Sequence, residues 1–133
     1  MIWSPLAGGF LSGKYRRNGN SPEGARRSGE FDFPPINKEI AYSCIEAMQP
    51  IADKYGVSIA RIALAWILSK NEVSSVIIGA KTKEQLLDNI AASSLELTAN
   101  ELASLNEISA IPKEYPGWMI DFQTAYRTTP PIK

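Results

Sequence analysis

Two short segments of this 133-residue sequence carry residue types that bind phosphate. The first runs from Gly8 to Lys14 and fits the pattern G-x-x-x-x-G-K, in which glycine backbone and a lysine ammonium surround a phosphate group. A nucleotide triphosphatase loop would continue with Ser or Thr and a helix, whereas Tyr15 and turn-forming residues follow here. The segment is therefore a weak triphosphatase signal. Two alternatives stay open: a cradle for another kind of phosphate, or a glycine-rich turn with a solvated lysine.

The second segment, Gly79 to Gln85, runs from a predicted strand directly into a predicted helix. Free backbone N–H groups and the positive end of the helix dipole attract anions at such a helix start, and Lys81 adds a formal charge. The alternative is an ordinary turn in which Thr82 caps the helix and the lysines Lys81 and Lys83 are solvated.

Polar side chains continue along the same predicted helix. Gln85, Asp88 and Asn89 can share one helix face, where they either contact an adenine edge or face solvent. The only cysteine, Cys44, lies on another predicted helix with apolar neighbours and no accompanying base. We therefore interpret it as a small buried hydrophobe rather than a nucleophile.

The composition excludes several classes of function. The sequence contains no histidine, which removes Ser-His and Cys-His catalysis and most catalytic zinc sites. Fourteen basic residues balance fourteen acidic residues, which argues against a nucleic-acid or membrane-surface binder. No carboxylate pair or metal-ligand spacing stands out, and no apolar run is long enough to span a membrane. We therefore expect no metal, no nucleic acid and no membrane among its partners, and a cytoplasmic location.

The elements that must position these residues follow from hydrophobic periodicity and turn signals. Pro50 predicts a kink or a division into two pieces in the first long helix, and Gly56 is placed to end it. Thr82 and Gln85 form one predicted capping box, and Thr98 and Glu101 form a second. The predicted order is a strand over 1–6, an irregular stretch over 7–38, helices over 38–55 and 59–70, a strand over 73–78, helices over 82–92 and from 98, and an ordered tail over 112–133.

This order predicts an α/β fold with a parallel sheet, because strands and helices alternate. Two strands are too few to make a buried sheet, however, and the helix over 59–70 is apolar nearly all round. Such a helix has to be covered on more than one side. The sequence therefore looks like part of a larger α/β structure.

Four segments resemble the aldo-keto reductases, in the order and spacing of that family. The resemblance implies one unit over residues 1–133 that forms the C-terminal part of a (β/α)8 TIM barrel. This part would hold the last two β/α units with extra helices and a tail, mostly helical and incomplete as a barrel. The matching segments are Ser4–Tyr15, Ser58–Trp66, Val76–Asn89 and Tyr115–Met119.

The resemblance also implies a binding site for NADP(H). Its 2′-phosphate end would be held near Lys81, which favours NADPH over NADH. Family members place an arginine in the first loop, so Lys14 would contact phosphate there with Arg26 or Arg27, and the ending Tyr115–Met119 is similar to bacterial members. The implied contacts are Ser4, Pro5, Leu6, Ala7 and Gly8 along the pyrophosphate, Gly79, Lys81 and Thr82 at the 2′-phosphate, and Gln85, Asp88 and Asn89 at the adenine.

The family's catalytic tyrosine, lysine, aspartate and histidine belong to the first half of the barrel, and no segment here matches their motifs. We therefore expect the isolated chain to supply the NADP-binding part of an aldehyde or ketone reductase and to be inactive alone. Its partners would be the dinucleotide and either the missing N-terminal half of the barrel or a second copy. Two alternatives stay open: a non-catalytic NADP-binding or self-associating module, and an inactive truncated gene product.

Overall fold

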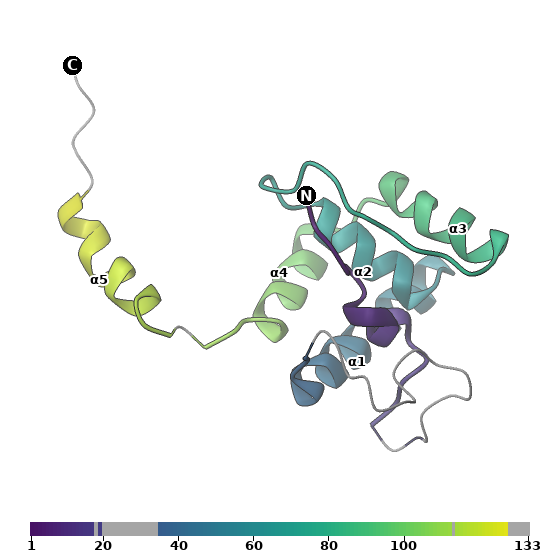
Figure 1. Ribbon diagram of the computed structural model, residues 1–133, viewed down its shortest axis with the longest axis horizontal. Helices are drawn as coiled ribbons and strands as arrows, with labels where there is room; N and C mark the ends of the chain where they lie inside the picture. The colour runs from purple at the N-terminus through teal and green to yellow at the C-terminus, as the bar shows by residue number, and fades with distance from the viewer. Residues whose placement is uncertain (18, 20–34, 113, 128–133) are drawn as a thin grey trace.

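The computed structural model describes residues 1–17, 19, 35–112 and 114–127, and it is mostly helical (Figure 1). None of the helices in these ranges is long and apolar enough to cross a membrane. Along the chain the elements are the 3-10 helix η1 (Ala7–Ser12), α1 (Lys38–Tyr55), α2 (Ile59–Leu68), α3 (Lys83–Ile90), the 3-10 helix η2 (Ala91–Ser94), α4 (Ala99–Ile108) and α5 (Gly117–Arg127).

The two predicted strands meet in parallel, but only at a single point. Ile2 forms an isolated parallel bridge with Val76. The Ile2 N–H donates to the Ser75 carbonyl at 2.9 Å, and the Ile77 N–H donates to the Ile2 carbonyl at 2.9 Å. The prediction of parallel pairing is confirmed, whereas the prediction of two regular strands is wrong for the described residues. A strand gains its regularity from neighbours on both edges, and each of these segments has one partner here.

Helix α1 runs unbroken from Lys38 to Tyr55, so the predicted division at Pro50 is wrong. Pro50 is exposed, so water can reach the backbone carbonyl that loses its helical partner. The helix begins where the Asn37 side chain accepts the Ile40 N–H, and it ends at Gly56, which adopts the predicted left-handed conformation with φ of 63°. Its buried face consists of Cys44, Ile45, Met48, Ile51 and Ala52.

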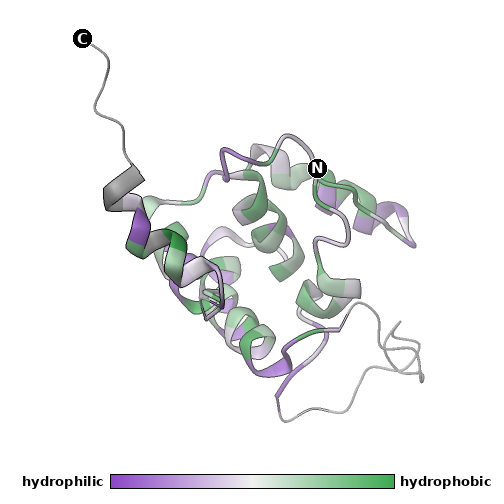
Figure 2. Ribbon diagram, turned by 60° about the vertical axis from the view of Figure 1, so that its left-hand side comes forward, coloured by the Kyte–Doolittle hydropathy of each residue, from purple (hydrophilic) through white to green (hydrophobic). Residues whose placement is uncertain are grey.

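Helix α2 lies at the centre of the body and packs against α1, α3, η1 and η2. It begins at the predicted cap Ser58, whose hydroxyl accepts the Arg61 N–H, and it ends at Leu68 rather than near Lys70. Its apolar character on nearly all sides matches its burial, as the hydropathy colours of Figure 2 show. The core gathers around it and includes Phe10, Tyr15, Ile45, Met48, Ile59, Ile62, Ala63 and Leu105.

Helix α4 packs along α1 and is fixed by a polar cluster at its start. The Thr98–Glu101 capping box is confirmed, with both of its hydrogen bonds present. Glu101 also accepts from Lys54 Nζ at 2.8 Å and from the Tyr55 hydroxyl at 3.1 Å, so it joins α4 to the end of α1. The hydrogen bond from Lys54, followed by those from Thr98 and Tyr55, lowers the pKa of Glu101 to about 2.

The sequence patterns did not predict α5, which occupies the middle of the expected tail. Figure 1 shows α5 standing apart from helices α1 to α4. Its apolar residues Trp118 and Ile120 are exposed. Residues 117–127 of the tail are therefore helical, and among the described elements α5 makes no extensive contact with α1 to α4.

The glycine-rich loop packs closely on the start of α2 at Gly13. Gly13 has φ of 79°, and a Cβ atom added there would lie 2.7 Å from Ile59 Cδ1 and 3.2 Å from Ile59 Cβ. Gly9 has a similar φ of 91°, but an added Cβ would meet no atom within 4 Å. Both positions favour glycine by backbone conformation, and Gly13 also requires it for packing.

Replacing Glu101 by Gln should lower the free energy of unfolding at pH 7 by about 1 kcal/mol, because the ion pair with Lys54 is lost. A lowered carboxyl pKa stabilises the fold above the ordinary value of 4.5, and this contribution disappears as the pH falls through about 2. Urea denaturation should therefore show a larger difference between Glu101→Gln and the parent at pH 7 than at pH 2, where about half of the Glu101 carboxyls are protonated. Glu107→Gln, on the exposed side of the same helix, is the control. An equal difference at both pH values would contradict the assignment.

Replacing Gly13 by Ala should destabilise the chain more than replacing Gly9 by Ala. Each change places a Cβ in a left-handed conformation, at a cost of about 1–2 kcal/mol. Gly13→Ala adds the collision with Ile59, so its cost should exceed that of Gly9→Ala by about 1 kcal/mol or more. Urea denaturation of the two variants measures this difference directly, and equal losses would show that the loop does not press on α2.

Candidate functional site

The parallel bridge joins two segments of the chain, and the two predicted phosphate-binding segments follow it at the same end. Ile2 and Val76 run in the same direction, so the residues that follow them leave the bridge together. The loop that contains the first segment begins at Ser4, two residues beyond Ile2, and Gly79 lies three residues beyond Val76. In parallel α/β structures this carboxyl end is where ligands bind.

The first loop is a tight structure held by its own backbone. Ser4 and Ala7 have positive φ values of 52° and 50°, and Gly8 has one of 67°. The Ser4 hydroxyl accepts the Gly8 N–H at 3.1 Å, and the Ser4 carbonyl accepts the Ala7 N–H at 2.9 Å. The Gly9 N–H donates to the Leu6 carbonyl at 2.9 Å.

These contacts change how the loop can act on a phosphate. The N–H groups of Ala7, Gly8 and Gly9 already donate within the loop, so they are not free donors in this conformation. The Ser4 hydroxyl accepts one bond and retains its own proton for a ligand. The stretch over 7–38, predicted to be irregular, contains the 3-10 helix η1 over Ala7–Ser12.

Lys14 lies directly after this loop and is exposed. No acidic side chain within the described ranges lies at ion-pair distance from it. Its ammonium group can therefore reach an anionic ligand without giving up a partner among the described residues. Arg26 and Arg27, the other predicted phosphate contacts of this loop, lie outside the described residues.

The second segment is tied to helix α3 by two side-chain amides. Gln85 Oε1 accepts the Lys81 N–H at 2.9 Å, and Asn89 Nδ2 donates to the Gly79 carbonyl at 3.4 Å. The Thr82 hydroxyl accepts the Gln85 N–H at 3.3 Å, which confirms Thr82 as the cap. The predicted capping box is wrong in one bond, because the Gln85 side chain reaches Lys81 rather than Thr82.

This turn presents open space and positive charge. An added Cβ at Gly79 would meet no atom within 4 Å, so a ligand can approach the backbone there. Lys81, Thr82 and Lys83 are all exposed, and in the described part of the chain neither lysine has an ion-pair partner. The donor set suits a phosphate, since an ammonium group, a hydroxyl and a helix N-terminus all favour negative charge.

Asp88 is committed to the protein rather than free for a ligand. Its carboxylate accepts from Arg61 Nε at 2.9 Å and from Arg61 Nη2, and it also accepts the Ser58 hydroxyl. Arg61 and Asp88 are each about a quarter exposed at the side chain. The pair joins α2 to α3 and was missed from the sequence, because nothing in the local pattern relates two residues 27 positions apart.

Other groups that could do chemistry have structural roles. Cys44 is a buried free thiol whose pKa is raised by burial, which agrees with its interpretation as a small hydrophobe. Tyr15 is buried and stacks on Phe10 with ring centroids 4.6 Å apart. Among the described residues no group of three His, Cys, Asp or Glu side chains could hold a metal ion.

A hollow of about 300 Å³ lies elsewhere, between the end of α2 and the segment that follows η2. It is lined mainly by small and apolar residues such as Ala65, Leu68 and Leu95. None of the predicted site residues lines it. We therefore assign the candidate site to the two segments that follow the Ile2–Val76 bridge and not to this hollow.

The chain is similar to known proteins over most of its length. A probable voltage-gated potassium channel subunit beta from Oryza sativa subsp. japonica is 40% identical over 93 residues, which cover 68% of this chain and 28% of that protein. A putative voltage-gated potassium channel subunit beta from Schizosaccharomyces pombe is 34% identical over 116 residues, which cover 80% of this chain and 33% of that protein. The uncharacterized oxidoreductase YrpG from Bacillus subtilis is 33% identical over 108 residues, which cover 81% of this chain and 31% of that protein.

The chain thus spans about a third or less of the length of these relatives. A family model described as the aldo/keto reductase family matches residues 1–110, which include both segments predicted to bind phosphate and the helices between them. The family implies a TIM barrel, and a mostly helical structure with one parallel bridge is consistent with part of one. The chain belongs to the aldo/keto reductase family of oxidoreductases.

Proposed function

We propose that this chain is the C-terminal, NADP(H)-binding part of an NADPH-dependent reductase of aldehydes or ketones. The observation that carries the proposal is the parallel bridge between Ile2 and Val76, which sends two segments with exposed lysines to one end. Two separate ammonium groups suit a ligand with two separate phosphates. NADPH carries a pyrophosphate and a 2′-phosphate, whereas NADH lacks the second.

In this proposal each segment holds one phosphate region. The pyrophosphate lies along the first loop, with the Ser4 hydroxyl and the Lys14 ammonium as its donors. The 2′-phosphate lies at the open turn, where Lys81 and Thr82 face solvent. The remaining contacts are those that the resemblance to the family implies: Pro5, Leu6, Ala7 and Gly8 line the pyrophosphate, Gly79 lies at the 2′-phosphate, Arg26 or Arg27 adds a phosphate contact, and Gln85 and Asn89 border the adenine.

Asp88 has a different role from its neighbours in the proposed site. Both of its oxygens are engaged by Arg61 and Ser58, so it supports the adenine end by fixing α3 against α2. Gln85 holds the turn through Lys81, which leaves its amide nitrogen for a ligand. When bound, the nicotinamide supplies a hydride to a carbonyl carbon, and the residues of this chain bind and orient the cofactor.

The proposal also assigns catalysis to residues outside this chain. The alignments cover only 28–33% of the relatives, which leaves room for six further β/α units and for the four catalytic residues of the family. Residues 1–133 would be one structural unit of the complete barrel. The buried free thiol of Cys44 agrees with a cytoplasmic location for that protein.

An exposed apolar surface supports the placement in a larger barrel. Ile77, Leu86, Leu87 and Ile90 are each between 43% and 56% exposed, beside the parallel bridge and on α3. Large apolar surfaces on a small chain mark contact with another part of a protein. The same surface favours a second candidate, a self-associating NADP-binding module. Light scattering that gives the mass of a single chain would remove this second candidate.

Replacing Lys81 by Met should weaken NADPH binding about ten- to a hundredfold and leave NADH binding nearly unchanged, because only NADPH has a 2′-phosphate. Replacing Lys14 by Met should weaken both dinucleotides, because both have a pyrophosphate. Fluorescence titration of the purified chain measures each dissociation constant. Lys83→Met, which removes the same charge two residues beyond Lys81, is the matched control. No binding of NADPH by the parent chain at millimolar concentration would overturn the proposal.

The purified chain should show no NADPH-dependent reduction of aldehydes or ketones. The physical reason is that hydride transfer needs a proton donor beside the carbonyl oxygen, and the family's donor and its assisting residues have no matching segment in this sequence. Loss of NADPH absorbance in the presence of a panel of aldehydes measures the rate. Turnover above the rate without protein would contradict the assignment of catalysis to the missing part of the barrel.

A further inference from the structure

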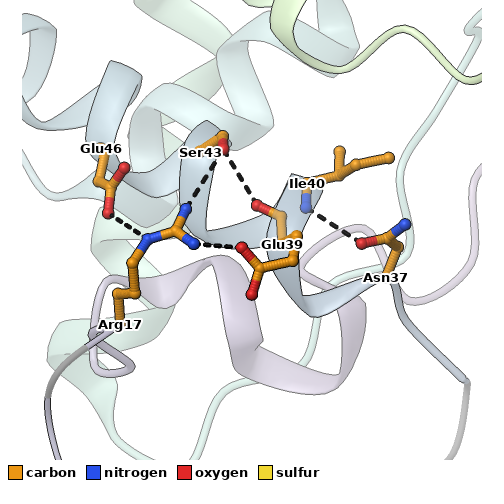
Figure 3. Close-up of polar contacts among 6 residues, drawn as sticks. All are labelled: Arg17, Asn37, Glu39, Ile40, Ser43 and Glu46. Atoms are coloured by element: carbon orange, nitrogen blue, oxygen red, sulfur yellow. Dashed lines mark hydrogen bonds and ion pairs between the residues drawn. The ribbon is translucent and has the colours of Figure 1, made fainter.

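Arg17 lies three residues beyond Lys14 and is bound to helix α1 from several sides (Figure 3). Its Nε donates to Glu46 at 3.2 Å, its Nη1 donates to Glu39, and its Nη2 donates to the Ser43 hydroxyl at 3.5 Å. Helix α1 therefore presents three side-chain acceptors, at 39, 43 and 46, to one guanidinium group.

Because of these hydrogen bonds, the guanidinium group of Arg17 is not a free cation. Two carboxylates face one guanidinium, and their hydrogen bonds raise its pKa above the ordinary value, Glu46 more than Glu39. Binding a phosphate with Arg17 would mean breaking contacts to both glutamates and placing the phosphate beside their negative charges. Arg16 is engaged in a similar way, since its Nη2 donates to Gln49 Oε1 at 2.8 Å.

Aromatic contacts continue the attachment from Arg17 back toward Lys14. The guanidinium carbon of Arg17 lies 5.5 Å from the centroid of the Tyr42 ring. The Tyr42 ring lies 5.2 Å from the Phe10 ring, and Phe10 stacks on Tyr15, the residue after Lys14. On the other side of Lys14, the Gly13 backbone lies so close to Ile59 that an added Cβ would be 2.7 Å from its Cδ1 atom. Lys14 is thus an exposed residue between two anchored neighbours.

We propose that Arg17 is a positioning residue, which fixes the loop to α1 and thereby holds Lys14 where a dinucleotide phosphate binds. This inference rests on the proposed function, because it needs Lys14 to contact phosphate. It separates the basic residues of the loop by role: Arg17 binds the protein, and Lys14 binds the ligand. The carboxylates of Glu39 and Glu46 take part in this positioning, because they accept the hydrogen bonds of Arg17.

Replacing both Glu39 and Glu46 by Gln distinguishes a positioning residue from a phosphate ligand by the sign of its effect. If Arg17 bound phosphate, releasing it from two carboxylates would tighten NADPH binding. If Arg17 positions Lys14, the double change should weaken NADPH binding about threefold to tenfold, even though the chain loses two negative charges. Glu96→Gln with Glu107→Gln, two exposed glutamates elsewhere, makes the same change in charge. Tighter binding by Glu39→Gln/Glu46→Gln than by this control would overturn the proposal.

A double-mutant cycle tests whether Arg17 acts through Lys14. Arg17→Met should weaken NADPH binding about tenfold in the parent chain and less than twofold in a Lys14→Met background. A role in general stability would give the same fold-change in both backgrounds, and so would an independent contact of Arg17 with the cofactor. Equal fold-changes would therefore overturn the proposal.

A measurement without cofactor separates failure of this inference from failure of the proposed function. Amide hydrogen exchange over residues 14–17 should be faster in Arg17→Met and in Glu39→Gln/Glu46→Gln than in the parent, with helix α2 unchanged. Unchanged exchange over 14–17 would show that Arg17 does not anchor the loop. Faster exchange in a chain that binds no NADPH would keep the anchor, and would overturn both the proposed function and the role of Lys14 in it.

Discussion

The burial of helix α2 is the constraint on which the rest of this structure depends. Six of its ten residues are buried, and an isolated helix of this kind would expose apolar surface on every side. Burying one large apolar side chain contributes about 1.5–3 kcal/mol, so covering α2 outweighs any single polar contact in the chain. Helices α1 and α3 and the 3-10 helices η1 and η2 all pack against it.

The same helix fixes both halves of the candidate site. Ile59, its first residue, lies against Gly13 and sets the position of the glycine-rich loop. Ser58 and Arg61, in its first turn, hold Asp88 and so set the position of α3 and of the turn before it. The distance between the two lysine-bearing segments is therefore controlled by the start of one buried helix. A site for two phosphates needs such a fixed separation.

The features that could be predicted from the sequence are those decided by neighbouring residues. Gly56 ends a helix and Ser58, Thr82 and Thr98 begin helices because each cap acts within about four positions. Gln85 was misassigned because two N–H groups, at Lys81 and Thr82, compete for its side chain. The strands were predicted from short apolar runs and turn signals, but regular strands also require partners from distant parts of a chain. Helix α5 begins at Gly117, directly after Pro116, and a proline followed by a glycine is typical of a turn rather than of a helix start.

At the candidate site, the sequence predicted the basic residues but could not divide them by role. Arginine and lysine look alike as charges, yet the described structure uses them differently. Arg16, Arg17 and Arg61 each donate to side-chain oxygens of the protein, and two of them pair with carboxylates. Lys14 and Lys81 point their charges at solvent. A planar guanidinium can bind several fixed acceptors at once, whereas an ammonium on a flexible stem can follow a ligand. In the proposed site, Arg16, Arg17 and Arg61 would therefore build the rigid frame, and Lys14 and Lys81 would remain for the phosphates.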